Sequence, residues 1–299
     1  MILGSNSSLP AYGRHHTSQI LNIGGLSLLI DCGDGTQYQL LKYKVKTSKV
    51  DHIFISHLHG DHYLGLMGIL FSQQLTGRKN KLTIYGQRGL DEIITTHLKY
   101  SGATFNYKIN FIELNPEQQT VIFENNEVEI QSFPLTHRIP CCGFLFKEKT
   151  KERKIIGEKI PRDFPIENFQ KLKNGEDILD ERGKILFKNE ELTSPPNKSA
   201  SYAYCSDTGF DETLIEKINM VDLLYHEATF LKEKKKWARQ TFHSTTEDAA
   251  IIAKQAKVGK LLIGHFSARY NDVQPFIDEC RDVFPKTLPA VEGEEYIVR

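Results

Sequence analysis

The densest group of chemically active side chains in this sequence is "SHLHGDH", residues 56–62. It places His57, His59, Asp61 and His62 directly after the apolar run "HIFI". Histidine nitrogens and carboxylate oxygens are the ligands that hydrolytic zinc sites use. On a loop that leaves a strand, the first two histidines can reach one point while Asp61 and His62 turn toward a second. The spacing therefore predicts half of the ligands of a site for two metal ions.

A two-metal site requires further ligands, and three isolated residues near predicted strand ends fit this role. His137 follows the apolar run "QSFPL", and His265 ends the run "KLLIGH". Asp207 in "YCSDTG" follows a tyrosine-rich strand, where a carboxylate could bridge two metals. His52 and His97 have no comparable setting and are better explained as structural residues. The predicted site thus has five histidine and two aspartate ligands.

Apolar runs that stop at turn residues predict the strands that position these ligands. Such runs include "LSLLIDCG", "VDHIFIS", "KLTIYG" and "VDLLYHEATF", and a final strand is expected in "EYIVR". Helical spacing predicts helices in "YLGLMGILFSQQL", "LDEIITTHLKYSG", "TTEDAAIIAKQAKVG" and "DVQPFIDECRDVF". Ligand groups of α/β folds collect at strand ends, so these elements predict an α/β protein with its site at one edge.

The composition is that of an ordinary globular protein, with 299 residues, 39% of them hydrophobic and 25% charged. No apolar run approaches the roughly 20 residues that span a bilayer, and no signal peptide is expected. The five cysteines, which include the neighbours Cys141 and Cys142, do not form a disulfide framework and indicate a reducing cytoplasm. Because the formal net charge is zero, local basic patches must hold any polyanion.

Residues 147–198 differ from the rest of the chain, because they are dense in charge and punctuated by Pro and Gly. The segment is either a partly mobile surface insertion or an arm that contacts a large substrate. The predicted organisation is a single metallo-hydrolase domain over residues 1–299 with this arm inserted.

The ligand pattern resembles that of the metallo-β-lactamase fold superfamily of dinuclear hydrolases. The resemblance implies an αβ/βα four-layer sandwich with the metals at one edge between two sheets. It implies two Zn²⁺ per subunit, although other divalent metals would also fit. A water between two such metals becomes a nucleophile near neutral pH, and Asp61 could ligate a metal or assist the deprotonation. The implied ligands are His57, His59 and His137 for one zinc, and Asp61, His62 and His265 for the other, with Asp207 bridging.

Further motifs are similar to those of the ribonuclease Z family, the tRNA 3′-processing endonucleases. They are "HEAT" at 226–229 and "HST" at 243–245, with similar stretches in "LTIYGQRGL" and "GHFSARY". The resemblance runs from "LGSNSSLP" to just beyond His265. It implies a cytoplasmic zinc-dependent endoribonuclease that removes the 3′ trailer from precursor tRNA and leaves a 3′-hydroxyl. It also implies a homodimer.

The HEAT and HST motifs supply candidates for proton transfer. The departing 3′-oxygen requires a proton donor, and His243 is the candidate because imidazole transfers protons near pH 7. Glu227 could orient this imidazole. Alternatively, Ser244, Thr245 and Thr246 only cap the helix that begins at "EDAAII", and the two roles are compatible.

Two features depart from the ribonuclease Z pattern. The family's arm carries a Gly-Pro-rich tip, whereas no Gly-Pro dipeptide occurs here, and "GRHHTSQ" stands where an Arg-Asn pair is usual. They leave open a related binuclear-zinc phosphodiesterase acting on cyclic nucleotides or short oligonucleotides. A flavodiiron-like redox protein is a third alternative, which His59 and the lack of a flavin domain argue against.

Three local basic segments are candidates for phosphate binding. They are "KYKVKTSK", the Lys and Arg residues of 147–162, and "KEKKKWARQ". Trp237 in the last segment either stacks on a base or packs in the ordinary way.

Overall fold

The computed structural model describes all 299 residues, which form two compact units. The larger unit comprises residues 1–124, 128–147 and 200–299, and the smaller one comprises residues 125–127 and 148–199. All residues for which the sequence predicts a role in metal binding or proton transfer belong to the larger unit.

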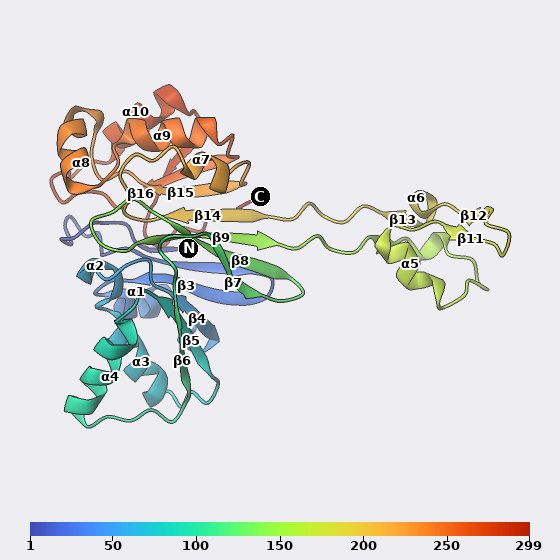
Figure 1. Cartoon of the computed structure of the whole chain (residues 1–299), viewed down its shortest axis with the longest axis horizontal. Helices are drawn as coiled ribbons and strands as arrows, with labels where there is room; N and C mark the ends of the chain where they lie inside the picture. The colour runs from blue at the N-terminus through green and yellow to red at the C-terminus, as the bar shows by residue number, and fades with distance from the viewer. The chain divides into compact units, whose positions relative to one another are not determined.

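A six-stranded sheet forms the first half of the larger unit (Figure 1). Its order is β1-β2-β3-β4-β5-β6, antiparallel from β1 to β3 and parallel from β3 to β6. Parallel neighbours require crossover connections, which contain helices α1, α3 and α4. The strands are β1 (Ile2–Gly4), β2 (Ser18–Ile23), β3 (Leu26–Cys32), β4 (Val50–Phe54), β5 (Leu82–Gly86) and β6 (Ile109–Glu113).

A seven-stranded sheet forms the second half, in the order β17-β16-β15-β14-β9-β8-β7. Strands β14 to β17 are parallel, whereas β9 is antiparallel to β14 and β7 is antiparallel to β8. Residues that follow β14, β15 and β16 therefore meet at one edge of this sheet. The strands are β7 (Thr120–Glu124), β8 (Val128–Pro134), β9 (Cys142–Glu148), β14 (Ser201–Cys205), β15 (Leu223–Glu227), β16 (Lys260–Gly264) and β17 (Thr287–Pro289).

Alternating side chains along the strands build three apolar layers. In β16, Leu262 packs in the core between the sheets, while Leu261 and Ile263 pack toward the outer helices. Phe54 of β4 meets Phe144 of β9 across the centre, with 5.4 Å between the ring centroids. Successive strand residues point to opposite faces, so each sheet buries both of its faces. The result is the αβ/βα four-layer sandwich that the sequence predicts (Figure 1).

Helices cover the outer face of each sheet, and the four helices predicted from apolar spacing are confirmed. Helix α4 ends at Gly102, whose φ of 64° suits glycine, and Thr245 caps α9 in a capping box with Asp248. The helices on the first sheet are α1 (Thr36–Lys42), α2 (Gly60–Tyr63), α3 (Leu66–Leu75) and α4 (Leu90–Ser101). Those of the second half are α7 (Leu214–Lys217), α8 (Lys235–Thr241), α9 (Thr246–Gln255) and α10 (Gln274–Val283).

The strand predicted in "EYIVR" is wrong, since the last strand is β17 and residues 294–299 pair with no strand. Tyr296 and Val298 nevertheless pack against the central core. The Tyr296 hydroxyl donates a hydrogen bond to the Pro289 carbonyl at 2.6 Å. The apolar pattern thus reflects side-chain packing without the backbone pairing of a strand.

The smaller unit has its own apolar cluster, formed by Phe164, Leu172, Ile178 and Leu192. Around it lie two short hairpin-like strand pairs and two short helices. The Asn189 amide donates to the carbonyl of Leu172 at 2.7 Å and ties the unit together. The elements are β10 (Lys154–Ile155) with β13 (Thr193–Ser194), β11 (Ile178–Leu179) with β12 (Ile185–Phe187), α5 (Asn168–Asn174) and α6 (Asn189–Leu192).

All five cysteines are buried and free. None of the helices combines the length and the apolar composition that crossing a membrane requires.

Replacing Phe144 with alanine should lower the free energy of unfolding by about 3–5 kcal/mol, because it leaves a cavity between the sheets. Tyr100→Ala is the control, since Tyr100 is 81% exposed, and it should change stability by no more than about 0.5 kcal/mol. Urea unfolding followed by circular dichroism measures both. Equal effects of the two substitutions would contradict the stacked-sheet core.

Candidate metal centre

The predicted ligands follow strands that end at the same edge of the sandwich. His57 and His59 lie on the loop between β4 and α2, and α2 carries Asp61 and His62. His137 follows β8, Asp207 follows β14 and His265 follows β16. The structure brings all seven predicted ligands together, in groups whose ligand atoms lie within 4.8 Å of one another.

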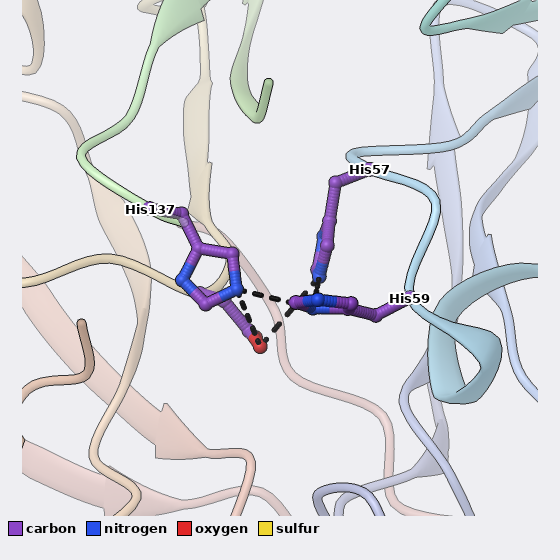
Figure 2. A group of neighbouring side chains, drawn as sticks. His57, His59 and His137 are labelled. Atoms are coloured by element: carbon purple, nitrogen blue, oxygen red, sulfur yellow. Dashed lines mark hydrogen bonds and ion pairs between the residues drawn. The ribbon is translucent and has the colours of Figure 1, made fainter. Parts of the chain in front are cut away.

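The first group gathers three imidazoles and one carboxylate, and Figure 2 shows the three rings turned toward one another. His59 Nδ1 lies 3.0 Å from His57 Nε2 and 3.1 Å from His137 Nε2. Asp207 Oδ2 lies 3.7 Å from His57 Nε2 and 3.9 Å from His137 Nε2. Three ring nitrogens that face one point leave room for one ion among them.

The second group faces the other oxygen of the same carboxylate. Asp207 Oδ1 lies 3.3 Å from His62 Nε2 and 3.1 Å from His265 Nε2. Asp61 Oδ2 lies 3.5 Å from each of these two nitrogens. Asp207 therefore points one oxygen at each group, which is the arrangement of a bridging carboxylate.

In three of the rings, the nitrogen that faces away from the centre has a hydrogen-bond partner that sets the tautomer. His137 Nδ1 donates to the Phe242 carbonyl at 3.0 Å, and His265 Nδ1 lies 2.9 Å from Thr229 Oγ1. His57 Nδ1 lies 3.0 Å from the Ser56 hydroxyl. When Nδ1 carries the proton, the lone pair is on Nε2, the atom that faces the site. These contacts orient the rings for metal binding.

Asp31, which the sequence analysis does not single out, anchors the second group from behind. It is fully buried, and its carboxylate accepts from His62 Nδ1 at 2.8 Å and from the Tyr204 hydroxyl at 2.6 Å. It also accepts from the Ser56 amide at 2.8 Å. Its φ of 52° is unusual for a non-glycine residue, as is the φ of 60° at His265. The available signal was an acidic residue inside the apolar run "LLIDC".

Burial and neighbouring charge set the protonation of these groups. Burial, reinforced by His62, lowers the pKa of His57 well below its usual range, so this imidazole is neutral and able to ligate. Burial also opposes a charge on His62, yet Asp207, Asp61 and Asp31 together raise its pKa well above the usual range. The three carboxylates around His62 favour positive charge at this point, whether from a protonated imidazole or from a metal ion.

The unsatisfied atoms of the centre test whether metal ions fit. His62 Nε2, His265 Nε2 and Asp207 Oδ1 are buried and have no hydrogen-bond partner. An unpaired buried polar atom is costly, and these three converge on one point. Neutral imidazoles and carboxylates are ligands of divalent zinc, so the residues present fit such an ion.

The pair predicted for proton transfer lies beside the two groups. His243 Nδ1 lies 2.8 Å from Glu227 Oε1 and 3.9 Å from Asp207 Oδ2. Burial disfavours its charged form, but Glu227 and Asp207 outweigh burial and raise the pKa of His243 to about 9. Thr208 and Thr229 donate further hydrogen bonds to the Glu227 carboxylate. Glu227 therefore holds the His243 ring, and Thr229 links that pair to His265.

An open cleft of about 770 Å³ lies over the centre. Its lining includes the predicted ligands His59, Asp61, Asp207 and His265 together with His243. The remaining lining includes two arginines, one tryptophan and residues of the opening loop, namely Arg138, Arg269, Trp237, Ser7, Ser8, Leu9 and His16. A ligand in the cleft would therefore meet both positive charge and an aromatic surface.

Ribonuclease Z of Cytophaga hutchinsonii is 46% identical to this chain over 297 residues, 99% of this chain and 95% of its own length. Ribonuclease Z of Bacteroides fragilis strain YCH46 is 43% identical over 295 residues, 98% of this chain and 96% of its own length. The chain belongs to the ribonuclease Z family. It is thus a metal-dependent phosphodiester hydrolase, and the flavodiiron alternative is wrong. Residues 1–155 also match the family model described as Anti-Pycsar protein Apyc1, so over this half the chain belongs to that family as well.

Two solved structures share the fold. Human tRNase Z, short form, matches with a TM-score of 0.66 and 25% identity, over 90% of this chain and 93% of the human chain. The metallo-β-lactamase fold protein YhfI from Bacillus subtilis matches with a TM-score of 0.68 and 19% identity, over 98% of this chain and 95% of its own. The metallo-β-lactamase fold that the resemblance implies is confirmed.

Asp31→Asn should weaken zinc binding by roughly 10–100-fold, because the amide removes the charge that orients His62. Asp34→Asn, at an exposed aspartate of the following turn, is the matched control and should bind zinc like the original protein. Competition with a chromophoric chelator measures both affinities. An unchanged affinity in Asp31→Asn would show that Asp31 serves the fold alone.

Proposed function

We propose that this protein is a zinc-dependent endoribonuclease that removes the 3′ trailer from precursor tRNA and leaves a 3′-hydroxyl. Support comes from its ribonuclease Z relatives and from the likeness to human tRNase Z. The observation that carries the proposal is the convergence of seven predicted ligand side chains, four of which line one cleft, beside the His243–Glu227 pair.

Two zinc ions per subunit would be held by the two groups, with the carboxylate of Asp207 between them. The first would take His57, His59 and His137, and the second would take Asp61, His62 and His265. Bound there, the ions would supply Lewis-acid chemistry, lowering the pKa of a water and neutralising phosphate charge. Asp61, which lines the cleft, would also accept a hydrogen bond from that water.

His243 would donate the proton that the departing 3′-oxygen requires. A pKa of about 9 keeps its imidazole protonated at neutral pH, with Nδ1 bound to Glu227. Its Nε2–H is then the remaining donor of the ring. Glu227 acts as a positioning residue because it touches His243 and not the substrate.

Two arginines of the cleft would bind phosphates on either side of the cut. The guanidinium groups of Arg138 and Arg269 line the cleft, and neither forms an ion pair with a carboxylate. Guanidinium groups bind phosphate oxygens in a bidentate manner. Unpaired arginines beside the metal ligands therefore favour a polyanionic substrate.

The smaller unit would be the arm that holds the tRNA body. Its side chains Lys154, Lys159 and Arg162 are exposed and form no ion pair with a carboxylate. The arm lacks the Gly-Pro tip, so positive charge rather than that tip would provide the grip.

The protein would act as a homodimer in the cytoplasm. Helix α1 exposes Tyr38 and Leu41, and Leu64 and Leu75 are exposed at the ends of α2 and α3. Helices α1 and α3 are joined by a hydrogen bond from Gln37 to Ser72. Large exposed apolar side chains on packed helices suit a protein–protein interface. Light scattering that shows only monomers would contradict this assembly.

Zinc-loaded protein should cut a labelled precursor tRNA once, at the trailer junction, and Asp61→Ala should abolish the cut. Bis-p-nitrophenyl phosphate serves as a parallel small substrate. Turnover of this diester with an intact precursor would overturn tRNA processing and favour the phosphodiesterase that acts on cyclic nucleotides or short oligonucleotides.

His243→Ala should lower kcat on precursor tRNA by about 10²–10⁴-fold, because the leaving group loses its acid. Zinc content should stay unchanged, since His243 is outside the two ligand groups. His97→Ala, at an exposed histidine of α4, is the control and should cut like the original protein. Loss of zinc from His243→Ala would instead make His243 a ligand.

Replacing residues 148–199 with a short Gly-Ser linker should raise KM for precursor tRNA by about tenfold or more, as phosphate contacts are lost. The linker is feasible because Lys147 and Ser201 are paired neighbours in β9 and β14. Hydrolysis of bis-p-nitrophenyl phosphate should remain unchanged. An unaltered KM would show that the arm does not bind substrate.

A further inference from the structure

Trp237, the only tryptophan of the chain, lines the cleft together with the metal ligands. It lies on α8, and 46% of the residue is exposed. Its indole N–H has no hydrogen-bond partner within the protein. Because the apolar ring is large and part of it faces the cleft, the indole offers a flat surface that is accessible to a ligand.

Helix α8 is held in place, so the position of the indole is defined. Arg239 of the same helix forms two bonds with the buried carboxylate of Asp248, at 2.8 and 3.2 Å. Phe242, which follows α8, accepts the hydrogen bond from the predicted ligand His137 at 3.0 Å. The chain then reaches His243. Trp237 is thus tied to the catalytic centre through its own helix.

A cation lies against the indole. The guanidinium carbon of Arg269 is 5.7 Å from the centre of the Trp237 ring and 5.9 Å from the centre of the Phe230 ring. The only hydrogen-bond partner of this guanidinium is the Ser267 hydroxyl, at 3.4 Å from Nη1. Its other donors are free for an anion. An aromatic face next to an unpaired arginine matches a nucleotide, which has a flat base joined to a phosphate.

We infer that Trp237 stacks on a nucleobase that flanks the scissile phosphate, while Arg269 binds the neighbouring phosphate. The inference rests on the proposed function and names a substrate-binding residue for it. Every base has a π face, so this contact would be independent of sequence. It would separate nucleic acid from diesters that carry no base.

A double-mutant cycle on metal-loaded protein tests the inference. The first change is Trp237→Leu in the protein. The second is in the substrate, as two precursor tRNAs that each carry one abasic nucleotide, before or after the cut. Trp237→Leu should lower kcat/KM about tenfold or more on the intact precursor and by less than about twofold on one of the abasic precursors. Trp237→Phe, which keeps a ring, should retain most of the activity. Equal losses on the intact and on both abasic precursors would overturn the inference.

The fluorescence of this single tryptophan provides a measurement that needs no cleavage. A short single-stranded RNA should quench it, and an abasic oligonucleotide of the same length should not. If the precursor stays uncut while RNA still quenches, the proposed function fails and the stacking contact stands. Equal signals from RNA and from the abasic oligonucleotide would refute stacking.

The zinc content of the purified protein reports whether the centre is intact. Trp237→Leu should bind as much zinc as the original protein, because the substitution leaves every predicted zinc ligand in place. A loss of zinc from Trp237→Leu would assign Trp237 to the structure of the site and overturn its role in base binding.

Discussion

The rest of this structure depends on one constraint: buried nitrogen and oxygen atoms of the predicted ligands face one another and cannot all form hydrogen bonds among themselves. Ring nitrogens of His57, His59 and His137 face each other at about hydrogen-bond distance, and two buried imidazole nitrogens with one oxygen of Asp207 have no partner. Such an arrangement is unfavourable unless a cation occupies it. The fold therefore has to offset the free-energy cost of holding these groups together, and a bound metal cation would stabilise them.

The stacked sheets provide that rigidity. Each sheet is buried on both faces, so the strands that end beneath the site cannot shift without disturbing three apolar layers. Asp31 shows the connection most directly. Its carboxylate links Tyr204 of the second sheet to His62 of the centre, so the core and the ligand group share one hydrogen-bond network.

Hydrogen bonds also connect the pair predicted for proton transfer to the predicted metal ligands. Thr229 contacts both Glu227 and His265, so one hydroxyl links a predicted ligand to the carboxylate that holds the predicted proton donor. The cleft above adds Arg269 and Trp237, which have no role in the centre itself. In the proposed function, chemistry at the base of the cleft and recognition on its wall would therefore be carried by different residues. Such a separation would let one kind of metal centre serve many substrates across a fold superfamily.

The amino-acid sequence by itself determined the type of chemistry, because ligands of one loop are close in the chain and their spacing is visible. His137, Asp207 and His265 were also accessible, since each follows an apolar run that predicts a strand. The layered fold followed from the resemblance that these residues carry. The C-terminal "EYIVR" was misassigned because apolar packing of Tyr296 and Val298 resembles the pattern of a strand.

Only the tertiary structure decided which residues stand behind the ligands and around them. Asp31 lies 31 positions from His62 in the chain, and Tyr204 lies 173 positions from Asp31, yet all three meet in one buried network. The same holds for Arg269 and Trp237, which are brought together by the packing of α8 against the loop after β16. Hydrogen bonds and ring contacts act over a few ångströms in space, and local periodicity in a sequence carries no record of them.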